Sequence, residues 1–322
     1  MAINLSPLFG RLPSAVEHLD VSSQLVCRFE EWKDVTIWPK SGLIRRSNRE
    51  MEFEPIWGAE NLKECGDFYS RWSWIPKTMK GRYFCITLHW GFNYYHWFCD
   101  VLPRFLRVIP RLDSDVIIIL PPELSAWQKI SLELLSLTSH RTLQYHGRRP
   151  WRVERLVYFS PLAFTGDVDG ETLTEMRNSI WHSLNCAPTK PGSRKLYLTR
   201  KNQLSRRIIN EDALLPILHD EGFEIIDCDQ LTLPGQVVLF SEASCIVGPH
   251  GAALTNLLWA PPGTRVLEIF EPSWIRRFYW SLCMALGHDY HCAVANPCPN
   301  PTNLPNMSVA PIDFYHALKS FR

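Results

Sequence analysis

Short apolar runs and amphipathic segments alternate along most of the chain after residue 83. Continuous apolar or β-branched runs indicate buried strands, which we expect at 83–88, 116–120, 155–160, 195–199, 223–228, 245–248 and 265–269. Apolar side chains at three- and four-residue spacing indicate helices, which we expect at 95–108, 127–137, 210–221, 233–241, 252–259 and 312–321. The first 80 residues mix Pro, Trp and charged residues without clear periodicity, and we expect loops and edge strands there.

The alternation of strands and helices predicts parallel sheets with helices on both faces. A polar stretch with Pro and Gly at 186–193 interrupts the alternation and divides the chain into two doubly wound α/β domains. We place an N-terminal domain at 1–185, a C-terminal domain at 186–300, and a tail with a final helix at 301–322 that packs back on the N-terminal domain. Asn210 is expected to cap the helix that begins there. In such sheets ligands bind beyond the carboxyl ends of the strands, where the strand order reverses.

The composition narrows the classes of function. Hydrophobic residues make up 46% and charged residues 21% of the chain, as in a folded rather than a disordered protein. The formal net charge is +1, whereas a protein that binds nucleic acid through phosphate contacts usually carries a basic excess. We therefore expect no nucleic-acid partner.

The cysteines, the N-terminus and the hydropathy bear on location. None of the 10 Cys forms a CxxC pair, which argues against a zinc site. The first residues lack a basic stretch followed by an apolar run. No segment reaches about 18 uninterrupted apolar residues. These features favour a cytoplasmic protein with free thiols, and they leave a peripheral association with the inner face of a membrane open.

The segment Gly248–Asn256 carries the strongest local signal. It runs from a predicted strand through a small-residue turn into a predicted helix. The first backbone N–H groups of such a helix, together with its dipole, form an anion site that suits a diphosphate. Gly251 lets the backbone approach a ligand closely, and His250 can donate to a phosphate oxygen. The alternative is an ordinary tight turn with a buried His250 bonded to backbone.

Three arginines near a second strand end are candidates for the same ligand. Arg200 follows the strand at 195–199, and Arg206 and Arg207 precede the helix at 210–221. Guanidinium groups suit phosphate because they are planar, permanently charged and bidentate. The alternative is that the three arginines are ordinary solvated surface charges. Their position at one sheet edge argues against this alternative for at least one of them.

Two carboxylates stand at the end of the strand predicted at 265–269. A carboxylate in this place can accept two hydrogen bonds from a ribose diol. We assign that role to Glu268 rather than to Glu271. The alternative is a carboxylate that caps a loop.

In the first half of the chain, His96 and Asp100 are four residues apart on a predicted helix and therefore share a face. A histidine paired with a carboxylate can act as a general base, because its pKa lies near neutrality. Arg104 is one turn further along that face. The alternative is a core histidine whose partner is Asp100, and the spacing alone leaves both readings open.

Together these motifs resemble glycosyltransferase family 61. The resemblance rests on His96-Trp97 with Asp100-Val101-Leu102-Pro103-Arg104, and on the stretch from Tyr197 to Glu271 with its Tyr-Leu-Thr-Arg, Arg-Arg-Ile-Ile-Asn-Glu and Gly-Pro-His-Gly-Ala-Ala-Leu-Thr-Asn motifs. It implies a GT-B architecture, in which two Rossmann-like domains face a cleft, with inversion at the sugar carbon and no required metal. No DxD-type carboxylate pair follows a predicted strand. Since the sequence shows no membrane anchor, it is most similar to the bacterial members that build capsular polysaccharide or exopolysaccharide.

The resemblance implies transfer of a hexose or pentose from a nucleoside diphosphate-sugar to a hydroxyl of a carbohydrate or glycoconjugate acceptor, without a cofactor. The C-terminal half is expected to bind the donor and the N-terminal half the acceptor, with Asp100 or His96 as the catalytic base. The expected donor-binding residues are Arg200, Arg206, Arg207, His250, Gly251, Ala252, Asn256 and Glu268. The expected acceptor-side residues are Asn93, Trp97 and Arg104.

Two other classes compete with a transferase. A non-catalytic carbohydrate-binding or scaffold protein could use the same fold, because a fold alone does not determine activity. A dinucleotide-dependent dehydrogenase is disfavoured, because no GxGxxG follows a predicted strand.

Overall fold

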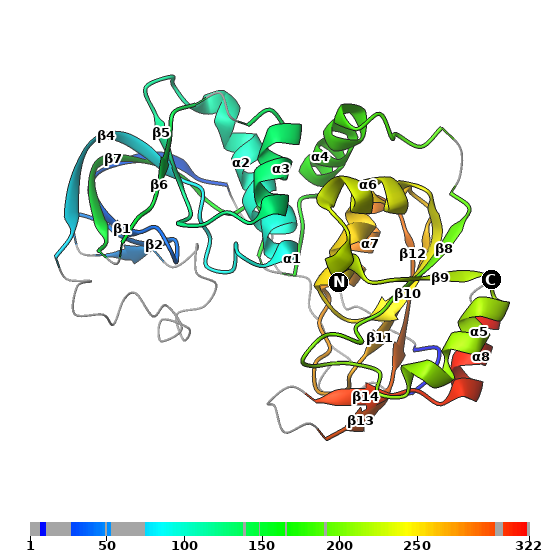
Figure 1. The fold of residues 1–322 in the computed structure, drawn as a ribbon. Coiled ribbons are helices and arrows are strands. Elements are labelled where there is room, and N and C mark those ends of the chain that lie inside the picture. Colours follow the sequence, from blue (N-terminus) through cyan, green and yellow to red (C-terminus); the bar gives the residue numbers. More distant parts are fainter. Residues whose placement is uncertain are drawn as a thin grey trace. The chain divides into compact units, whose positions relative to one another are not determined.

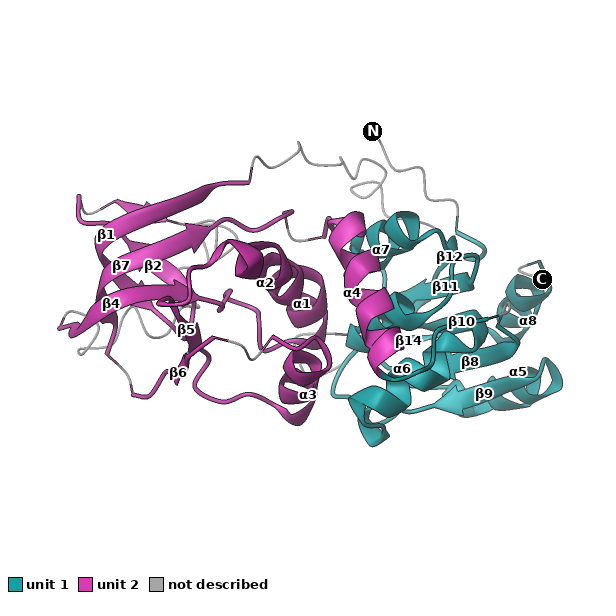
Figure 2. Cartoon of the chain, turned by 90° about the horizontal axis from the view of Figure 1, so that it is seen from above, with its two compact units in different colours: residues 1–22, 184–322 teal, residues 23–183 magenta. Residues whose placement is uncertain are grey.

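The computed structural model of the chain describes residues 7–10, 27–48, 50–52, 75–137, 140–147, 149–164, 166–189, 192–299 and 305–320. The chain divides into two compact units, which are coloured separately in Figure 2. We call residues 23–183 the N-terminal unit, and residues 184–322 with 1–22 the C-terminal unit. Each unit has its own β-sheet with helices packed beside it (Figure 1).

The N-terminal unit is built on a mixed sheet of seven described strands, in the order β3-β2-β1-β7-β4-β5-β6. Strands β7, β4, β5 and β6 run parallel, as the alternation predicts. Strand β1 is antiparallel to both β7 and β2, and β2 to β3, so the expectation of a purely parallel sheet is wrong for this unit. The strands are β1 Phe29–Trp38, β2 Leu43–Arg45, β3 Met51–Glu52, β4 Lys77–Cys85, β5 Ile117–Leu120, β6 Thr142–Gln144 and β7 Trp151–Phe159.

Strand β1 was not predicted because its first half is charged. Only its last four residues, from Val35, are all buried. The charged half pairs with side chains of other strands instead, since Arg82 of β4 binds Glu31 at 2.7 Å and Arg152 of β7 binds Asp34 at 2.5 Å. Cross-strand ion pairs, rather than an apolar run, therefore mark this part of the sheet.

Three described helices of the N-terminal unit lie beside the parallel half of its sheet, and the fourth, Gly170–Ser183, packs against two of them (Figure 1). The helix expected at 95–108 is present, but a π-helical turn interrupts it, in which the N–H of Leu102 donates to the carbonyl of Trp97. Pro103 follows directly and has no N–H to donate, so the register shifts where a regular hydrogen bond would be missing. The helices are α1 Tyr94–His96, the π turn Trp97–Val101, α2 Leu102–Val108, a 3-10 turn at Ile109–Arg111, α3 Ala126–Leu134 and α4 Gly170–Ser183.

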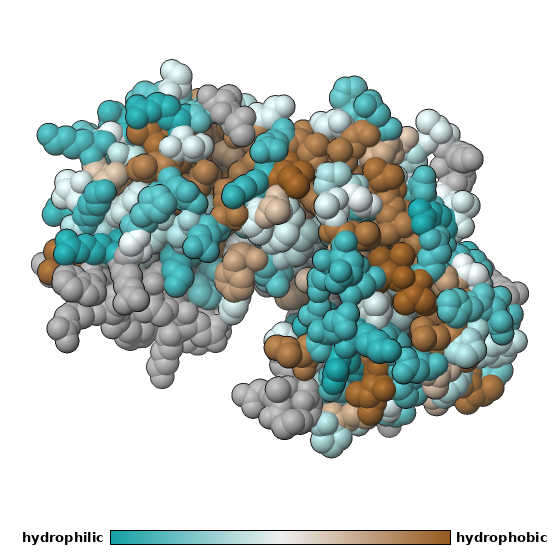
Figure 3. Space-filling model, viewed as in Figure 1, coloured by the Kyte–Doolittle hydropathy of each residue, from teal (hydrophilic) through white to brown (hydrophobic). Residues whose placement is uncertain are grey.

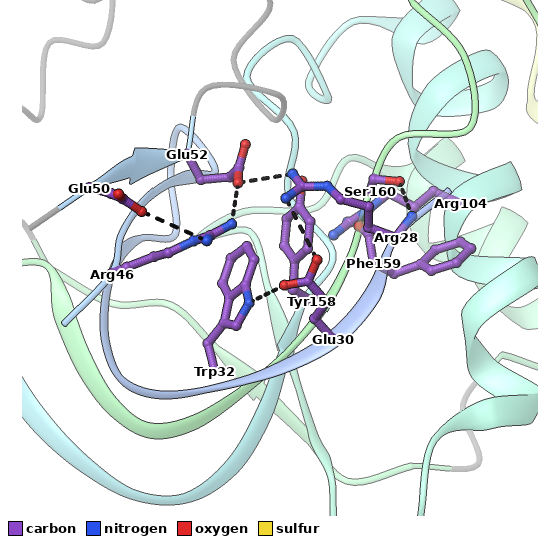
Figure 4. Close-up of polar contacts among 10 residues, drawn as sticks. All are labelled: Arg28, Glu30, Trp32, Arg46, Glu50, Glu52, Arg104, Tyr158, Phe159 and Ser160. Atoms are coloured by element: carbon purple, nitrogen blue, oxygen red, sulfur yellow. Dashed lines mark hydrogen bonds and ion pairs between the residues drawn. The ribbon is translucent and has the colours of Figure 1, made fainter. Parts of the chain in front are cut away.

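A stack of aromatic and cationic side chains holds the β2–β3 hairpin against β1 and β7 (Figure 4). The guanidinium of Arg46 lies 4.0 Å from the ring centre of Trp32, and Trp32 stacks on Tyr158 with 4.2 Å between ring centres. Glu52 pairs with both Arg46 and Arg28 at 2.9 Å. Each cation–π contact of this kind contributes about 0.5–1 kcal/mol at a partly exposed site, so the cluster adds to the stabilisation that buried Leu43 and Ile44 give this edge.

The C-terminal unit is built on a parallel sheet of five described strands, in the order β12-β11-β10-β8-β9. This is the doubly wound arrangement that the sequence predicts. The strand order reverses between β8 and β10, so the carboxyl ends of these two strands mark the place where such sheets bind ligands. The strands are β8 Arg194–Leu198, β9 Phe223–Ile226, β10 Ala243–Pro249, β11 Arg265–Phe270 and β12 Asp289–Val294. The helices are α5 Leu215–Asp220, α6 Leu233–Ser241, α7 Phe278–Leu286 and α8 Pro311–Ser320, with 3-10 segments at Glu211–Ala213, Cys228–Gln230 and Ala252–Trp259.

The final helix, α8, packs on the C-terminal unit. Its buried Phe314, Ala317 and Leu318 lie in one apolar cluster with Tyr197 of β8 and Leu214. We expected this helix to pack on the N-terminal domain, and the structure corrects that expectation. The reason is that the apolar face of α8 covers side chains of this sheet and of the segment before α5, which would otherwise face solvent. A short hairpin, β13 Asn296–Cys298 and β14 Asn306–Ser308, precedes the helix.

Two predicted helices of the C-terminal unit have another form. Residues Ala252–Trp259 form a 3-10 helix rather than an α-helix. The segment expected at 210–221 is a 3-10 turn followed by α5. Asn210 does not cap it, because its side chain bonds instead to the backbone C=O and N–H of Val309, at 2.7 and 3.1 Å.

Polar and apolar residues are interspersed on the face seen in Figure 3. In the part of the chain that the structure describes, no helix has the length and apolar character needed to cross a membrane. The most exposed large apolar side chains include Leu204 and Phe92, at 85% and 69%. Both lie in loops that follow the carboxyl end of a parallel strand, where functional residues of such sheets gather.

Candidate functional site

The first candidate site lies at the carboxyl ends of β8 and β10. Strand β8 ends at Leu198, two residues before Arg200, and β10 ends directly before His250 and Gly251. The strands approach closely here, because a Cβ on Gly248 would lie 2.9 Å from the Cβ of Leu198. The structure therefore brings two of the sequence motifs together at the point where the strand order reverses.

Gly251 makes room for the side chain of Arg200. A Cβ built on Gly251 would lie 1.9 Å from Nη1 of Arg200 and 2.8 Å from its Cζ. The backbone of Gly251 is extended, which any residue can adopt, so the requirement for glycine is space rather than conformation. The guanidinium group thus rests directly on the backbone of the turn.

Replacing Gly251 with alanine is expected to displace the Arg200 guanidinium. If the site binds the nucleoside diphosphate that the sequence predicts, the affinity should fall about tenfold, the loss of one charge-assisted hydrogen bond, as measured by calorimetric titration with UDP and GDP. Gly235→Ala is the matched control, because a Cβ there meets only the hydroxyl of Thr232, at 3.3 Å. Unchanged affinity in Gly251→Ala would mean that the position of Arg200 does not matter for binding.

Arg200 and Arg206 form a cationic pair with unused donors. Burial, followed by the charge of Arg206, lowers the pKa of Arg200 to about 10. Burial also lowers the pKa of Arg206. The Nε atoms of both are buried without a hydrogen-bond partner among the described residues. Two adjacent guanidinium groups with unfilled donors form a site that an anion would stabilise.

Arg207 lies apart from this pair. It lines a separate cavity of about 160 Å³ together with Lys201 and Asp212, and its Nη1 donates to the backbone carbonyl of Lys201 at 3.5 Å. The structure therefore does not bring Arg207 to the same place as Arg200 and Arg206.

A buried carboxylate orients His250. Glu268 is fully buried, and its two oxygens contact Nδ1 of His250 and the hydroxyl of Tyr290, the latter at 2.6 Å. Both oxygens of Glu268 are therefore used, and the expectation that Glu268 binds ribose is corrected to a role in holding His250. Burial lowers the pKa of His250, Glu268 opposes that effect, and the charges of Arg206 and Arg200 add to it.

His250 is expected to make the fold less stable at acidic pH. Its pKa in the folded chain lies below the ordinary 6.5, so between the two values the unfolded chain binds a proton that the folded chain does not. The free energy of unfolding should therefore fall as the pH drops below 6.5, by up to about 1.4 kcal/mol per pH unit. Urea unfolding at several pH values should give a flatter slope for His250→Asn. The exposed His219 of the same unit provides the control His219→Asn, and equal slopes in the two variants would contradict the assignment.

Asn256 is a structural residue rather than a ligand. It is fully buried, and its Nδ2 donates to Oε1 of Gln236 at 2.7 Å and to the carbonyl of Ala253 at 3.1 Å. The assignment of Asn256 to the donor is therefore corrected, because the amide ties the 3-10 helix to α6. Ala252, the first residue of that helix, is half-buried.

Several residues of the site were missed in the sequence. Tyr290 belongs to β12, and Tyr279 and Phe278 belong to α7; neither element was predicted. The rings of Tyr279 and Phe278 lie 5.2 and 6.2 Å from the ring of His250, and Phe270 lies at 5.4 Å. The aromatic run after Glu271 was a usable signal, since it is the densest cluster of rings near the motif.

The second candidate site is in the N-terminal unit, where His96 and Asp100 are paired as expected. The Nδ1 of His96 lies 2.7 Å from Oδ2 of Asp100, which is buried in the π turn. Asn93 caps the preceding helix, since its Oδ1 accepts a hydrogen bond from the N–H of Tyr95 at 2.9 Å. π turns are often found at functional sites, and this one sets the distance between the histidine and its carboxylate.

Two residues expected on the acceptor side have structural roles. Trp97 is fully buried, and its Nε1 donates to the hydroxyl of Ser131 at 2.9 Å. Arg104 is buried, and its Nε and Nη1 donate to the carbonyls of Phe159 and Cys85 at 2.6 and 3.0 Å (Figure 4 shows the first contact). Trp97 fills the core and Arg104 binds the carboxyl ends of β7 and β4, which corrects both assignments.

A family model described as Glycosyltransferase 61 matches residues 94–267. The chain belongs to this family. It is 30% identical over 98 residues to EGF domain-specific O-linked N-acetylglucosamine transferase of Drosophila melanogaster, covering 29% of this chain and 18% of that protein. It is 27% identical over 114 residues to Beta-1,2-xylosyltransferase of Arabidopsis thaliana, covering 31% of this chain and 21% of that protein. The matched part thus spans about a fifth of each relative.

The family 61 match includes the functional candidates of both units. His96, Asp100, Arg200, Arg206 and His250 all lie within residues 94–267. The match ends just before the carboxylate that orients His250, and strands β12 and β14 lie beyond it. The family match therefore includes the main candidate groups but not Glu268 and Tyr290, the residues that hold His250 in place.

Proposed function

We propose that this chain is an inverting, metal-independent glycosyltransferase that moves a hexose or pentose from a nucleoside diphosphate-sugar to a hydroxyl acceptor. The observation that carries the proposal is the guanidinium pair of Arg200 and Arg206 at the strand reversal point. Burial lowers the pKa of both groups, and each has an unused Nε among the described residues. A diphosphate would supply both the missing hydrogen-bond acceptors and the compensating charge.

The chemistry of the donor side follows from these groups. The acceptor oxygen bonds to the anomeric carbon as the bond from that carbon to the diphosphate breaks, and negative charge develops on the departing diphosphate. Arg200 and Arg206 stabilise this charge, with the first N–H groups of the 3-10 helix at Ala252. His250 is held through Nδ1 by Glu268, and its Nε2 has no hydrogen-bond partner among the described residues. We propose that Nε2 of His250 binds the nucleoside diphosphate-sugar.

We assign the acceptor to the N-terminal unit. Asp100 orients the ring of His96 through Nδ1, so the pair is suited to take the proton of an acceptor hydroxyl. In the loop before this helix, Trp90 lies 5.8 Å from the exposed ring of Phe92 and 6.4 Å from the ring of His96, measured between ring centres. Exposed aromatic rings suit the apolar face of a sugar.

The proposal extends to architecture and pathway. A GT-B arrangement would present the acceptor on one unit to the donor on the other. The names of the two relatives describe transfer of N-acetylglucosamine and of xylose, which supports a hexosyl or pentosyl donor here. Synthesis of polysaccharide or glycoconjugates, as in the bacterial capsular enzymes, and a cytoplasmic location with or without peripheral membrane association remain predictions.

Calorimetric titration with UDP and GDP tests the donor site. We expect one nucleoside diphosphate to bind in the presence of EDTA, and a panel of nucleotide sugars to reveal a donor that is hydrolysed. A folded sample that binds no common nucleoside diphosphate would refute the proposal. Binding without hydrolysis or transfer would favour the non-catalytic scaffold instead.

A further inference from the structure

Arg206 has a backbone conformation that needs support. Its φ is +52°, in the left-handed region that residues with a Cβ rarely adopt. A non-glycine residue in this region is strained and persists only where its surroundings hold it. The strained residue, Arg206, is one of the two arginines of the candidate donor site.

The backbone around Arg206 is held by the segment that begins at Pro305. The N–H of Arg206 donates to the carbonyl of Pro305 at 3.1 Å. The N–H of Arg207 donates to the side-chain oxygen Oδ1 of Asn306 at 3.1 Å. The N–H of Met307 in turn donates to the carbonyl of Arg207 at 2.8 Å. Every peptide unit next to the strained residue is therefore bonded to one short stretch of chain.

The pairing continues beyond the strained residue. The N–H of Ile209 donates to the carbonyl of Met307 at 2.9 Å, and Ile208 and Met307 form a parallel bridge. Both Ile208 and Met307 are buried in the core of the C-terminal unit. Asn210 bonds to the backbone of Val309 through both ends of its side-chain amide. The loop after β8 is thus fixed as an additional edge beside β14.

The side chain of Asn306 makes a hydrogen bond that packing of the core does not require. It is buried, yet its side-chain oxygen accepts a hydrogen bond from the N–H that directly follows the left-handed residue. An apolar residue would serve the core equally well, whereas only a side-chain acceptor satisfies that N–H.

We propose that Asn306 is a positioning residue of the donor site, which holds the backbone at Arg206 so that its guanidinium lies beside Arg200 and can bind a diphosphate. This inference rests on the proposed function of that site. It adds the stretch from Pro305 to Val309, which lies outside the family match at 94–267, to the machinery that binds the donor.

Labelling of Arg206 with phenylglyoxal, located by mass spectrometry, tests the positioning step without any nucleotide. In the intact chain the half-buried guanidinium should react slowly, and in Asn306→Ala at least several-fold faster. Asn306→Asp keeps the accepting oxygen and should restore slow labelling. Equal labelling rates in the native chain and Asn306→Ala, with both folded by circular dichroism, would overturn the inference.

Calorimetric titration with UDP and GDP tests the consequence for the ligand. Asn306→Ala should lower the affinity about tenfold in the native background and not at all in an Arg206→Ala background. If Asn306 acts on the ligand only through Arg206, then no interaction is left for Asn306→Ala to remove once Arg206 is absent. An equal loss in both backgrounds would indicate a merely structural role and would refute the inference. Failure of the native chain to bind either nucleotide would refute the proposed function instead, and the labelling result would still decide the role of Asn306.

Discussion

Replacing Asp100 with asparagine is expected to lower the rate of sugar transfer by about 10²- to 10⁴-fold, the range that general acid–base groups contribute. The substituted side chain would keep the shape of the original but not its negative charge, and its amide can hold the His96 ring in the wrong tautomer. Release of nucleoside diphosphate from the donor found in the hydrolysis screen measures the rate. Affinity for UDP or GDP should not change, because Asp100 belongs to the N-terminal unit and the proposed diphosphate site to the other.

Asp113→Asn is the control for this experiment. Asp113 is an exposed carboxylate of the same unit that pairs with Arg82 at 2.8 Å, so its loss removes the same charge without touching the histidine. Full activity in Asp100→Asn would show that the pair is only a core histidine with its partner.

The sequence predicted four of the five described strands of the C-terminal sheet from their apolar runs, and it missed β12, which begins with Asp289, Tyr290 and His291. β8, β10 and β11 all carry runs that are buried in the structure. It failed for β1, whose first half is charged and held by cross-strand ion pairs. It also failed for the position of α8, since an apolar helical face does not say which core it covers.

The candidate site was predicted in outline, but the roles within it were not. Glu268 looked like a ligand because it ends a strand, and only the structure shows that His250 and Tyr290 occupy both of its oxygens. Likewise, Trp97 and Arg104 share a helix with the His–Asp pair but point into the core. Helical spacing identifies a shared face and does not tell which side chains reach solvent.

Arg206 and Arg207 are the clearest case in which the sequence predicts candidate residues but not their roles. They are adjacent in sequence and identical in chemistry, so no pattern can rank one above the other. The left-handed backbone of Arg206 sends the two side chains to different places, one beside Arg200 and one to the cavity with Lys201. That conformation depends on residues about 100 positions later, as the hydrogen bond from Arg207 to Asn306 illustrates.

Arg206→Ala is therefore expected to weaken binding of UDP or GDP by about 10- to 100-fold, whereas Arg207→Ala should change it less than about twofold. The estimate for Arg206 follows from the loss of a charge-assisted hydrogen bond to a phosphate, at about 1.5–3 kcal/mol. The two variants remove the same charge from neighbouring positions, so any general electrostatic effect is common to both. Calorimetric titration at two salt concentrations measures the affinities and shows how far exposed charge contributes.

The comparison between the two variants decides what kind of site this is. A large loss in Arg206→Ala alone means that a specific pair of guanidinium groups binds the diphosphate, because the charge of Arg206 acts on Arg200 whereas Arg207 lines the cavity with Lys201. Similar losses in both variants, which disappear at high salt, would mean that the loop attracts anions only through its summed charge. In that case Gly251→Ala should also have no effect, since the position of one guanidinium would not matter. The three affinities together therefore separate a built phosphate site from a basic surface.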